Sequence, residues 1–187
     1  MTRYSKGFAM YEQEPDFHHI VPEDDDRERR VCRTCGFVDY VNPKIVAGVV
    51  ATREDGRVLM CKRAIEPRSG FWTLPAGYME EGESVQEAAL REAREEACAT
   101  LELDGLLGVY SVPRISQVQI FFRARFKAPG IAAGPESREV ALFEWDQLPL
   151  PDLAFPSVKW ALDDYRAGHG RDRPPAMRTQ GPDFKPL

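Results

Sequence analysis

The chain has 187 residues, which is enough for one domain of ordinary size with additional segments. Its residues are 43% hydrophobic and 29% charged, a composition that supports a folded core and excludes a disordered chain. The 30 acidic and 25 basic residues give a net charge of −5, which argues against a basic surface for nucleic acid. The apolar runs are far shorter than the ~20 residues of a membrane span, and residues 1–6 lead into no apolar stretch. We therefore expect a cytoplasmic protein that binds neither nucleic acid nor membranes.

Composition divides the chain into three zones. We predict an N-terminal arm over residues 1–44, a folded domain over residues 45–167 and an extended C-terminal tail over residues 168–187. The arm is polar and contains an acidic run at 23–26, whereas the second zone holds nearly all of the periodic apolar pattern. The tail is rich in glycine and proline, so we expect it to bury little apolar surface.

Four segments of the second zone have the composition of strands. Residues 45–52 and 57–63 are apolar-rich runs on either side of Asp55-Gly56, a pair that indicates a hairpin because glycine accepts the positive φ of a tight turn. Residues 117–126 and 140–145 are rich in β-branched and aromatic side chains, which favour strands.

Two helices are predicted between and after these strands. The first begins at Ser84, which forms a capping box with Glu87 and precedes small apolar residues at every fourth position. The second follows Pro156 and carries an apolar stripe over residues 158–165. Strands and helices in this mixed order predict an α/β layered domain.

The first predicted helix carries three acids, Glu92, Glu95 and Glu96. At about 100° per residue, their side chains fall within an arc of about 100°. Like charges three and four residues apart repel by a few tenths of a kcal/mol, roughly, so this grouping makes chemical sense around a divalent cation. Carboxylate oxygens favour Mg²⁺ or Mn²⁺ over zinc. The alternative is a solvated helix face on which Arg91 and Arg94 form salt bridges.

Residues 77–99 resemble the signature of the Nudix hydrolase family, Gly-x5-Glu-x7-Arg-Glu-U-x-Glu-Glu-x-Gly-U, where U is aliphatic. The positions that match without a gap are Gly77, Glu83, Arg91, Glu92, Glu95 and Glu96. Cys98 stands where the family has glycine, and we expect it to fit if the helix leaves at an ordinary φ. The resemblance implies a Nudix α/β/α sandwich with a mixed β-sheet.

The resemblance also implies a metal site and its chemistry. Glu92, Glu95 and Glu96 would hold divalent cations, Mg²⁺ or Mn²⁺, and Gly77 or its neighbour Ala76 would add a main-chain carbonyl. The metals of such enzymes polarise a diphosphate and activate the water that attacks phosphorus.

Further roles follow from the same resemblance. Arg91 would pair with Glu83 and orient the acids. Family members often add a downstream glutamate as ligand or base, for which Glu136 and Glu139 are the candidates. We include Glu139 in the predicted catalytic set, and for each of the two an ordinary surface acid is the alternative.

Three residues before the signature are candidates for binding substrate. Arg63 and Arg68 would neutralise phosphates. Trp72 would stack on a base, with a place in the core as the alternative. After the signature, the segment 111–119 is a candidate to face the ligand from the sheet. No Ser-Gln-Pro-Trp-Pro-Phe-Pro element follows the signature, and its absence argues against NADH as the substrate.

The arm contains a Cys-x-x-Cys pair, Cys32 and Cys35, which is half of the ligand set of a structural zinc site. It resembles the zinc ribbon of one Nudix branch, in which two such pairs are followed by Tyr-x-Asn-Pro-Lys, as residues 40–44 are here. That branch is associated with ADP-ribose and FAD as substrates.

The first Cys pair of that ribbon is missing. It aligns with Met10 and Gln13, which cannot replace thiolates, although His18 and His19 are near enough in sequence to be substitutes. We therefore predict a small, degenerate zinc-ribbon-like β segment held together by packing, and zinc at the remaining pair stays open.

We expect an Mg²⁺- or Mn²⁺-dependent Nudix pyrophosphohydrolase whose small-molecule substrate is a nucleoside diphosphate derivative, ADP-ribose or FAD. The alternative from another class is a non-catalytic Nudix domain that binds a nucleotide as a sensor or scaffold. The intact acids of the signature favour the enzyme, whereas Cys98 and the incomplete ribbon keep the sensor open. A nucleic-acid-binding ribbon is opposed by the acidic run at 23–26. The resemblance leaves a homodimer open as well.

Overall fold

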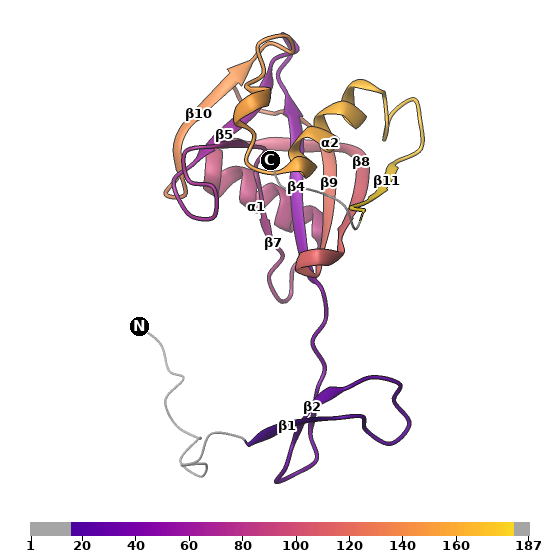
Figure 1. The fold of residues 1–187 in the computed structure, drawn as a ribbon. Helices are drawn as coiled ribbons and strands as arrows, with labels where there is room; N and C mark the ends of the chain where they lie inside the picture. Colours follow the sequence, from indigo (N-terminus) through magenta and orange to yellow (C-terminus); the bar gives the residue numbers. More distant parts are fainter. Residues whose placement is uncertain (1–15, 182–187) are drawn as a thin grey trace. The chain divides into compact units, whose positions relative to one another are not determined.

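The computed structural model describes residues 16–181, in two compact units that divide between Asn42 and Pro43 (Figure 1). The first unit is an antiparallel sheet of β1 (Phe17–Ile20), β2 (Arg29–Cys32) and β3 (Val38–Asp39). Within it, Asp25 accepts hydrogen bonds from Arg29, at 2.9 Å from Nε, and from two backbone N–H groups of its own turn. This small sheet agrees with the predicted ribbon-like β segment.

The second unit is built on a mixed sheet. Its main path, in spatial order, is β10 (Ser137–Phe143), β5 (Val58–Arg63), β4 (Lys44–Thr52), β9 (Gln117–Phe126), β8 (Leu101–Val112) and β11 (Ala176–Thr179). The pairs β4–β9 and β8–β11 are parallel, and the other neighbours on this path are antiparallel. Two short strands, β6 (Trp72–Thr73) and β7 (Ala76–Tyr78), pair with β5 and β4 respectively.

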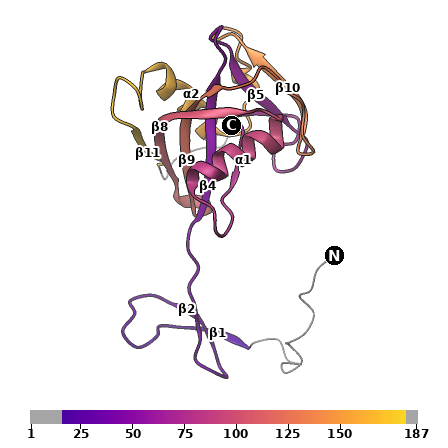
Figure 2. The same cartoon turned by 180° about the vertical axis from the view of Figure 1, so that it is seen from behind.

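Two helices cover opposite faces of this sheet, α1 (Val85–Ala97) and α2 (Pro156–Arg166), as the two opposed views show (Figures 1 and 2). Consecutive residues of a strand point to opposite faces, so Val49 of β4 packs in the cluster under α1 and Val50 in the cluster under α2. Short 3-10 helices, η1 (Pro113–Ile115) and η2 (Leu150–Asp152), complete the unit. The predicted α/β/α sandwich with a mixed sheet is confirmed.

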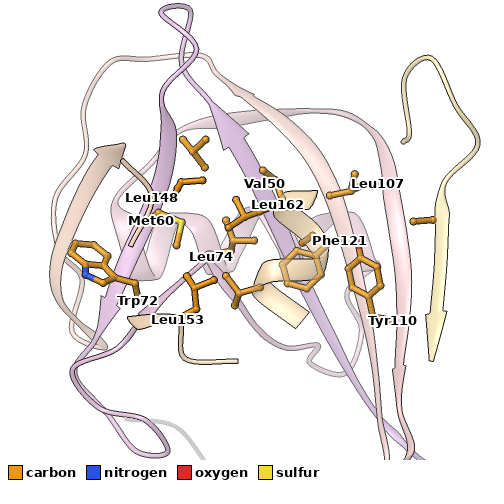
Figure 3. Packing of buried hydrophobic residues seen from close by; sticks show 14 residues of the cluster. Val50, Met60, Trp72, Leu74, Leu107, Tyr110, Phe121, Leu148, Leu153 and Leu162 are labelled. Carbon is orange, nitrogen blue, oxygen red and sulfur yellow. The ribbon is translucent and has the colours of Figure 1, made fainter. Parts of the chain in front are cut away.

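The two cores differ in the size of their side chains. Under α1 the helix contributes only alanines to the buried cluster, which lets its backbone approach the sheet closely. Under α2 the cluster contains large side chains, among them Tyr110, Phe121 and Leu153 (Figure 3). The close approach of α1 is what brings its acids up to the strands.

The predicted hairpin and both helices are confirmed. Arg53 N donates to Arg57 O at 3.0 Å across a turn in which Gly56 has a φ of 86°. The capping box is present, since Ser84 N donates to Glu87 Oε2 at 2.8 Å and Glu87 N donates to Ser84 Oγ at 3.3 Å.

Two strands differ from the sequence-based expectation. The strand expected at 140–145 lies at Ser137–Phe143, because β10 pairs along β5 from Arg63 to Val58 and ends where β5 begins. Strand β8, at Leu101–Val112, was not expected from the sequence. Register shifts at Leu103/Gly105 and Leu106/Gly108 interrupt its inward–outward alternation, which is the signal that identifies a strand.

The expected tail from residue 168 is not detached from the domain. Residues 176–179 form β11, which adds a parallel strand beside β8, and Ala176 is buried in the core. Arg178 forms an ion pair with Asp164 of α2, which is 2% exposed and also accepts from Tyr110 Oη at 3.0 Å. One buried carboxylate thus fixes this strand to the sheet and to α2.

Cys98 ends α1 in the left-handed conformation, with φ 50° and ψ 25°. Its N–H donates to Arg94 O and that of Ala99 to Ala93 O, so the chain turns away as a glycine-terminated helix does. The expectation of an ordinary φ at this position is wrong. Across residues 16–181, no helix has the length and apolar character needed to cross a membrane.

We predict that Cys98→Gly stabilises the protein. A side chain at a positive φ is strained and glycine is not, so the free energy of unfolding should rise by about 0.5–1 kcal/mol in urea titrations. Cys98→Ala keeps the Cβ and serves as the control, for which we expect little change. A Cys98→Gly protein that is less stable than Cys98→Ala would contradict this account.

Candidate active site

The site lies where the β4–β5 hairpin opens. These strands pair with each other only at Thr52 and Val58, beside their turn, and then diverge. β7 occupies the freed edge of β4, pairing through residues 46–48, and β6 occupies the freed edge of β5. Because α1 packs on both β4 and β7, the inner face of the helix meets the backbone of β7.

Glu92 lies against the backbone of β7. A Cβ added at Gly77 would overlap the carboxyl group of Glu92, so glycine at this position is required by close approach. Glu92 is 8% exposed, and burial raises its pKa despite the hydrogen bond from Arg91 Nη1 at 2.7 Å. The sequence-based pairing of Gly77 with an acid of the helix therefore has a direct steric basis.

Glu96 lies one helical turn further on and is 5% exposed. Its Oε2 accepts from Ala76 N at 3.0 Å. Burial raises the pKa of Glu96 to about 8, and the negative charge of Glu92 adds to this effect. Two neighbouring carboxylates with raised pKa values form an arrangement that a cation would stabilise.

Arg91 connects the acids. It donates to Glu83 through Nε at 3.1 Å and Nη2 at 2.8 Å, while Nη1 reaches Glu92 at 2.7 Å and Glu95 at 2.9 Å. The hydrogen bonds from Arg91 and from the backbone of Glu80 hold the pKa of Glu83 below its usual value. The guanidinium thus fixes the acids in place, as the resemblance implied.

These donors have the chemistry that Mg²⁺ or Mn²⁺ prefers. Glu92 and Glu96 offer carboxylate oxygens beside the main chain of Ala76 and Gly77, and Glu95, whose side chain is 57% exposed, lines the same cavity. Within residues 16–181, no three side chains of the His, Cys, Asp or Glu type converge on a common metal position, since Arg91 holds Glu92 and Glu95. The residues fit a divalent cation in kind, and the absence of a side chain at Gly77 lets the carboxyl group of Glu92 lie against the backbone there.

A loop before β10 brings a further acid to the site. Gly134 N donates to Glu96 O at 3.1 Å, and a Cβ at Gly134 would overlap Glu95 O, so the loop packs tightly on the end of α1. Glu136 lines the same cavity as the acids, and its charge contributes to the raised pKa of Glu96. Glu139, in contrast, is exposed on β10 and pairs with Lys62 Nζ at 3.4 Å. The structure therefore brings Glu136, and not Glu139, to the acids.

The acids form one wall of a cavity of about 1170 Å³. Arg63 and Arg68 line it as predicted, with Arg63 over the ring of Phe155 at 5.2 Å and Arg68 Nε donating to Ala154 O at 3.1 Å. Both cations are held by the loop between β5 and β6 and by the entry to α2. If a diphosphate bound between these arginines and the acids, the two guanidinium groups would neutralise part of its negative charge.

Trp72 does not reach this cavity. It is 7% exposed, packs within the core under α2 and makes an edge-to-face contact with Phe143 at 4.9 Å between ring centroids (Figure 3). Because β6 directs this ring into the core, no face is available for a base. The predicted stacking role of Trp72 is wrong, and the core alternative holds.

The cavity also includes residues of the segment 111–119, which was expected to face the ligand, and residues for which the sequence predicted no role. Those that add polar or aromatic groups are Tyr78, Arg114, Gln117, Gln119, Phe155, Trp160 and Gln180. Gln117 Nε2 donates to Tyr78 Oη at 2.9 Å, and Gln119 Nε2 donates to Gln117 Oε1 at 3.1 Å. Arg114, Gln117 and Gln119 belong to the segment that was expected to face the ligand. Phe155, Trp160 and Gln180 gave no signal in the sequence, because they reach the cavity through α2 and the unpredicted β11.

Comparison with known proteins identifies the class. The model of the NUDIX domain matches residues 42–163, and the Nudix N-terminal zinc-ribbon model matches residues 16–41. The chain therefore belongs to the Nudix hydrolase family. It is 34% identical over 136 residues to an ADP-ribose pyrophosphatase of Methanocaldococcus jannaschii, covering 70% of this chain and 78% of that protein.

Two further relatives extend the comparison. A crystal structure of a NUDIX hydrolase from Nitrosomonas europaea superimposes with a TM-score of 0.81 at 36% identity, over 89% of this chain and 94% of that one. A dihydroneopterin triphosphate diphosphatase of Escherichia coli is 32% identical over 113 residues, 60% of this chain and 69% of that protein. The relatives thus share the hydrolase fold and differ in the substrates for which they are named.

The zinc-ribbon unit offers an incomplete ligand set. Backbone N–H groups of Thr34 and Cys35 lie against Cys32 and lower its pKa, as in a metal-binding knuckle. His18 and His19 are consecutive in β1 and so point to opposite faces, which leaves at most one of them on the side of Cys32. The ligands among residues 16–42 therefore do not fit a four-coordinate zinc site, and Met10 and Gln13 lie outside the described residues.

We predict that stability falls with pH in the protein without metal. Glu96 keeps its proton up to a pKa of about 8 in the folded state, whereas the unfolded chain releases it near 4.5. Between these values the folded state binds more protons, so the free energy of unfolding decreases as pH rises. Urea titrations in EDTA across this range should show the decrease, and Glu96→Gln should flatten it.

Glu95→Gln is the matched control, since its side chain is exposed on the same helix. It should retain the pH dependence of the wild-type protein. An unchanged slope in Glu96→Gln would contradict the burial of a proton at this carboxyl group.

We also predict that the purified protein carries substoichiometric zinc or none, because the ribbon lacks its first thiolate pair. Elemental analysis after dialysis measures this directly. One tightly held zinc per chain would overturn the prediction and point to a histidine of β1 as a ligand.

Proposed function

We propose that this Nudix hydrolase is a divalent-cation-dependent enzyme that cleaves the diphosphate of a nucleoside diphosphate derivative, with ADP-ribose as the first candidate. The observation that carries the proposal is the buried pair Glu92 and Glu96 against the β7 backbone, at the wall of a cavity that arginines line. The ADP-ribose pyrophosphatase of M. jannaschii supports the choice of substrate.

Each group has a defined part in this proposal. Glu92, Glu95 and Glu96 would hold Mg²⁺ or Mn²⁺ with a main-chain carbonyl of Ala76 or Gly77, and a cation bound there would polarise the diphosphate and lower the pKa of an attacking water. Arg91 and Glu83 keep the acids in position. Arg63 and Arg68, which line the same cavity, bind the phosphate oxygens and favour the charge that develops during cleavage.

Glu136 is the proposed base. It lines the cavity on a loop that Gly134 fixes to α1, so its carboxylate faces the same space as the acids of the helix. In that place it accepts the proton of the attacking water. FAD shares the diphosphate and the adenosine of ADP-ribose, and a cavity of about 1170 Å³ has room for the larger molecule.

A triphosphate is the second candidate, favoured by the relative from E. coli that is named for dihydroneopterin triphosphate. An activity assay separates the two classes of substrate. Purified protein is incubated with Mg²⁺ or Mn²⁺ and with ADP-ribose, FAD, NADH or a nucleoside triphosphate, and the released product is identified. AMP from ADP-ribose supports the proposal, whereas turnover of triphosphates alone would replace it with the second candidate. Binding of nucleotides with no turnover would assign the chain to the sensor class.

We predict that Glu96→Gln lowers kcat on ADP-ribose by several orders of magnitude while its melting temperature in EDTA stays equal or rises. The amide keeps the size but cannot supply the charge that holds the cation, and it removes the cost of burying an ionisable group whose pKa is raised to about 8. Chelation by EDTA should stop the wild-type enzyme. Near-normal turnover of Glu96→Gln would contradict the metal site.

The paired variants Glu136→Gln and Glu139→Gln test the base. We expect Glu136→Gln to lower kcat by about a hundredfold or more, with KM little changed. Glu139→Gln removes only an exposed ion pair with Lys62 and should behave as the wild type. The reverse ranking would return Glu139 to the catalytic set.

A further inference from the structure

The C-terminal strand brings a polar side chain into the active-site cavity. Gln180 follows β11, and its N–H donates to Ser111 O at 2.9 Å, which extends the parallel ladder with β8 by one residue. This segment lies beyond residues 42–163, the part that the NUDIX domain model matches. The residue is therefore supplied by a strand that belongs to this chain outside the common domain.

The register fixes the side of the sheet on which Gln180 lies. Two residues earlier, Arg178 faces α2, where it pairs with the buried Asp164. Side chains two apart in a strand share a face, so Gln180 points to the same side, next to Val112 of β8. Gln117 of β9 pairs with Val112 from the other side. Gln180 and Gln117 thus flank Val112, about 10 Å apart, on the face that forms the cavity floor.

Gln180 has an unmet hydrogen-bonding requirement. Its Oε1 is buried and has no hydrogen-bond partner among residues 16–181, a condition that costs stability in the free protein. The residue itself lines the cavity. Turning the amide toward a bound molecule would give Oε1 the partner that the protein does not provide.

The surroundings suit a flat, uncharged ring. Val112 forms an apolar floor, and Trp160 of α2 lines the cavity on the helix side. Arg178, the nearest charge on the strand, is occupied by Asp164. Arg114, two residues after Val112, also lines the cavity. The acids and the two arginines proposed to bind phosphate belong to α1 and to the segment after β5, whereas the glutamine side chains come from β9 and from the residue after β11.

We propose that Gln180 is a specificity residue that binds the adenine of the substrate, with Oε1 accepting from the 6-amino group and Nε2 donating to N7. An amide carries an acceptor beside a donor, and this edge of adenine offers the complementary pair. The same edge of a 6-oxopurine offers two acceptors, so the amide forms only one of its two bonds. This assignment rests on the proposed nucleoside diphosphate substrate and names the base that the same site selects.

Calorimetric titration of the full chain in EDTA with AMP and with IMP tests the proposal without catalysis. We expect the wild type to bind AMP about tenfold or more tightly than IMP, because a lost bond at a buried amide costs about this much. Gln180→Met should weaken AMP binding to the level of IMP and leave IMP nearly unchanged. Gln147→Met, an exposed glutamine outside the cavity, is the matched control and should retain the preference.

If the melting temperature of Gln180→Met falls, Gln180→Ala is used in its place. The alanine variant keeps the hydrogen bond from the backbone N–H of residue 180 to Ser111 O. Equal affinities of the wild type for AMP and IMP would overturn the proposal, as would a preference that survives both substitutions. A wild type that prefers AMP but releases none from ADP-ribose with Mg²⁺ would refute the proposed function and leave Gln180 as an adenine-binding residue.

Discussion

The burial of two carboxylates against the backbone of β7 is the constraint on which this structure depends. Glu92 and Glu96 are both less than a tenth exposed, and removing such charges from water costs several kcal/mol each, roughly, unless they are neutralised. The protein compensates with one guanidinium on Glu92, one backbone N–H on Glu96 and a raised pKa at both. An arrangement of this kind is stable enough to fold and retains a strong preference for added positive charge.

Several features of the fold make the burial of the Glu92 and Glu96 carboxyl groups possible. The alanine face of α1 permits the helix to lie close to the sheet, and the opened β4–β5 hairpin makes room for β7 beneath it. Gly77 and Gly134 remove side chains where the backbone meets Glu92 and the end of α1. Arg91 then ties the helix to Glu83 in the loop before it. At Gly77, Glu83 and Arg91, the residues of the signature are those that the packing requires.

The sequence predicted those parts of the fold whose signals are local. The capping box at Ser84, the turn at Gly56 and the acid spacing of α1 each depend on a few neighbouring residues, and each lies where it was expected. Strand β8 was missed because its bulges break the alternation, and β11 because its stability comes from Asp164 and Tyr110, distant in the chain.

The candidate site shows the same division. The positions of the helix acids followed from the family signature, whereas the choice between Glu136 and Glu139 depended on how a loop packs on α1. Trp72 was assigned to the ligand because an aromatic next to a loop gives no information about the direction of its ring. Gln180 had no signal, since it reaches the cavity only through a strand pairing.

The central claim is that Glu96 holds a proton which a divalent cation displaces. It is tested most directly by calorimetric titration of Mn²⁺ into the protein at a pH midway between 4.5 and 8, in buffers that differ in ionisation enthalpy. The account predicts release of close to one proton per cation bound by the wild type and close to none by Glu96→Gln, which should also bind Mn²⁺ more weakly. Cation binding by the wild type with no proton release, or equal release from both proteins, would contradict it.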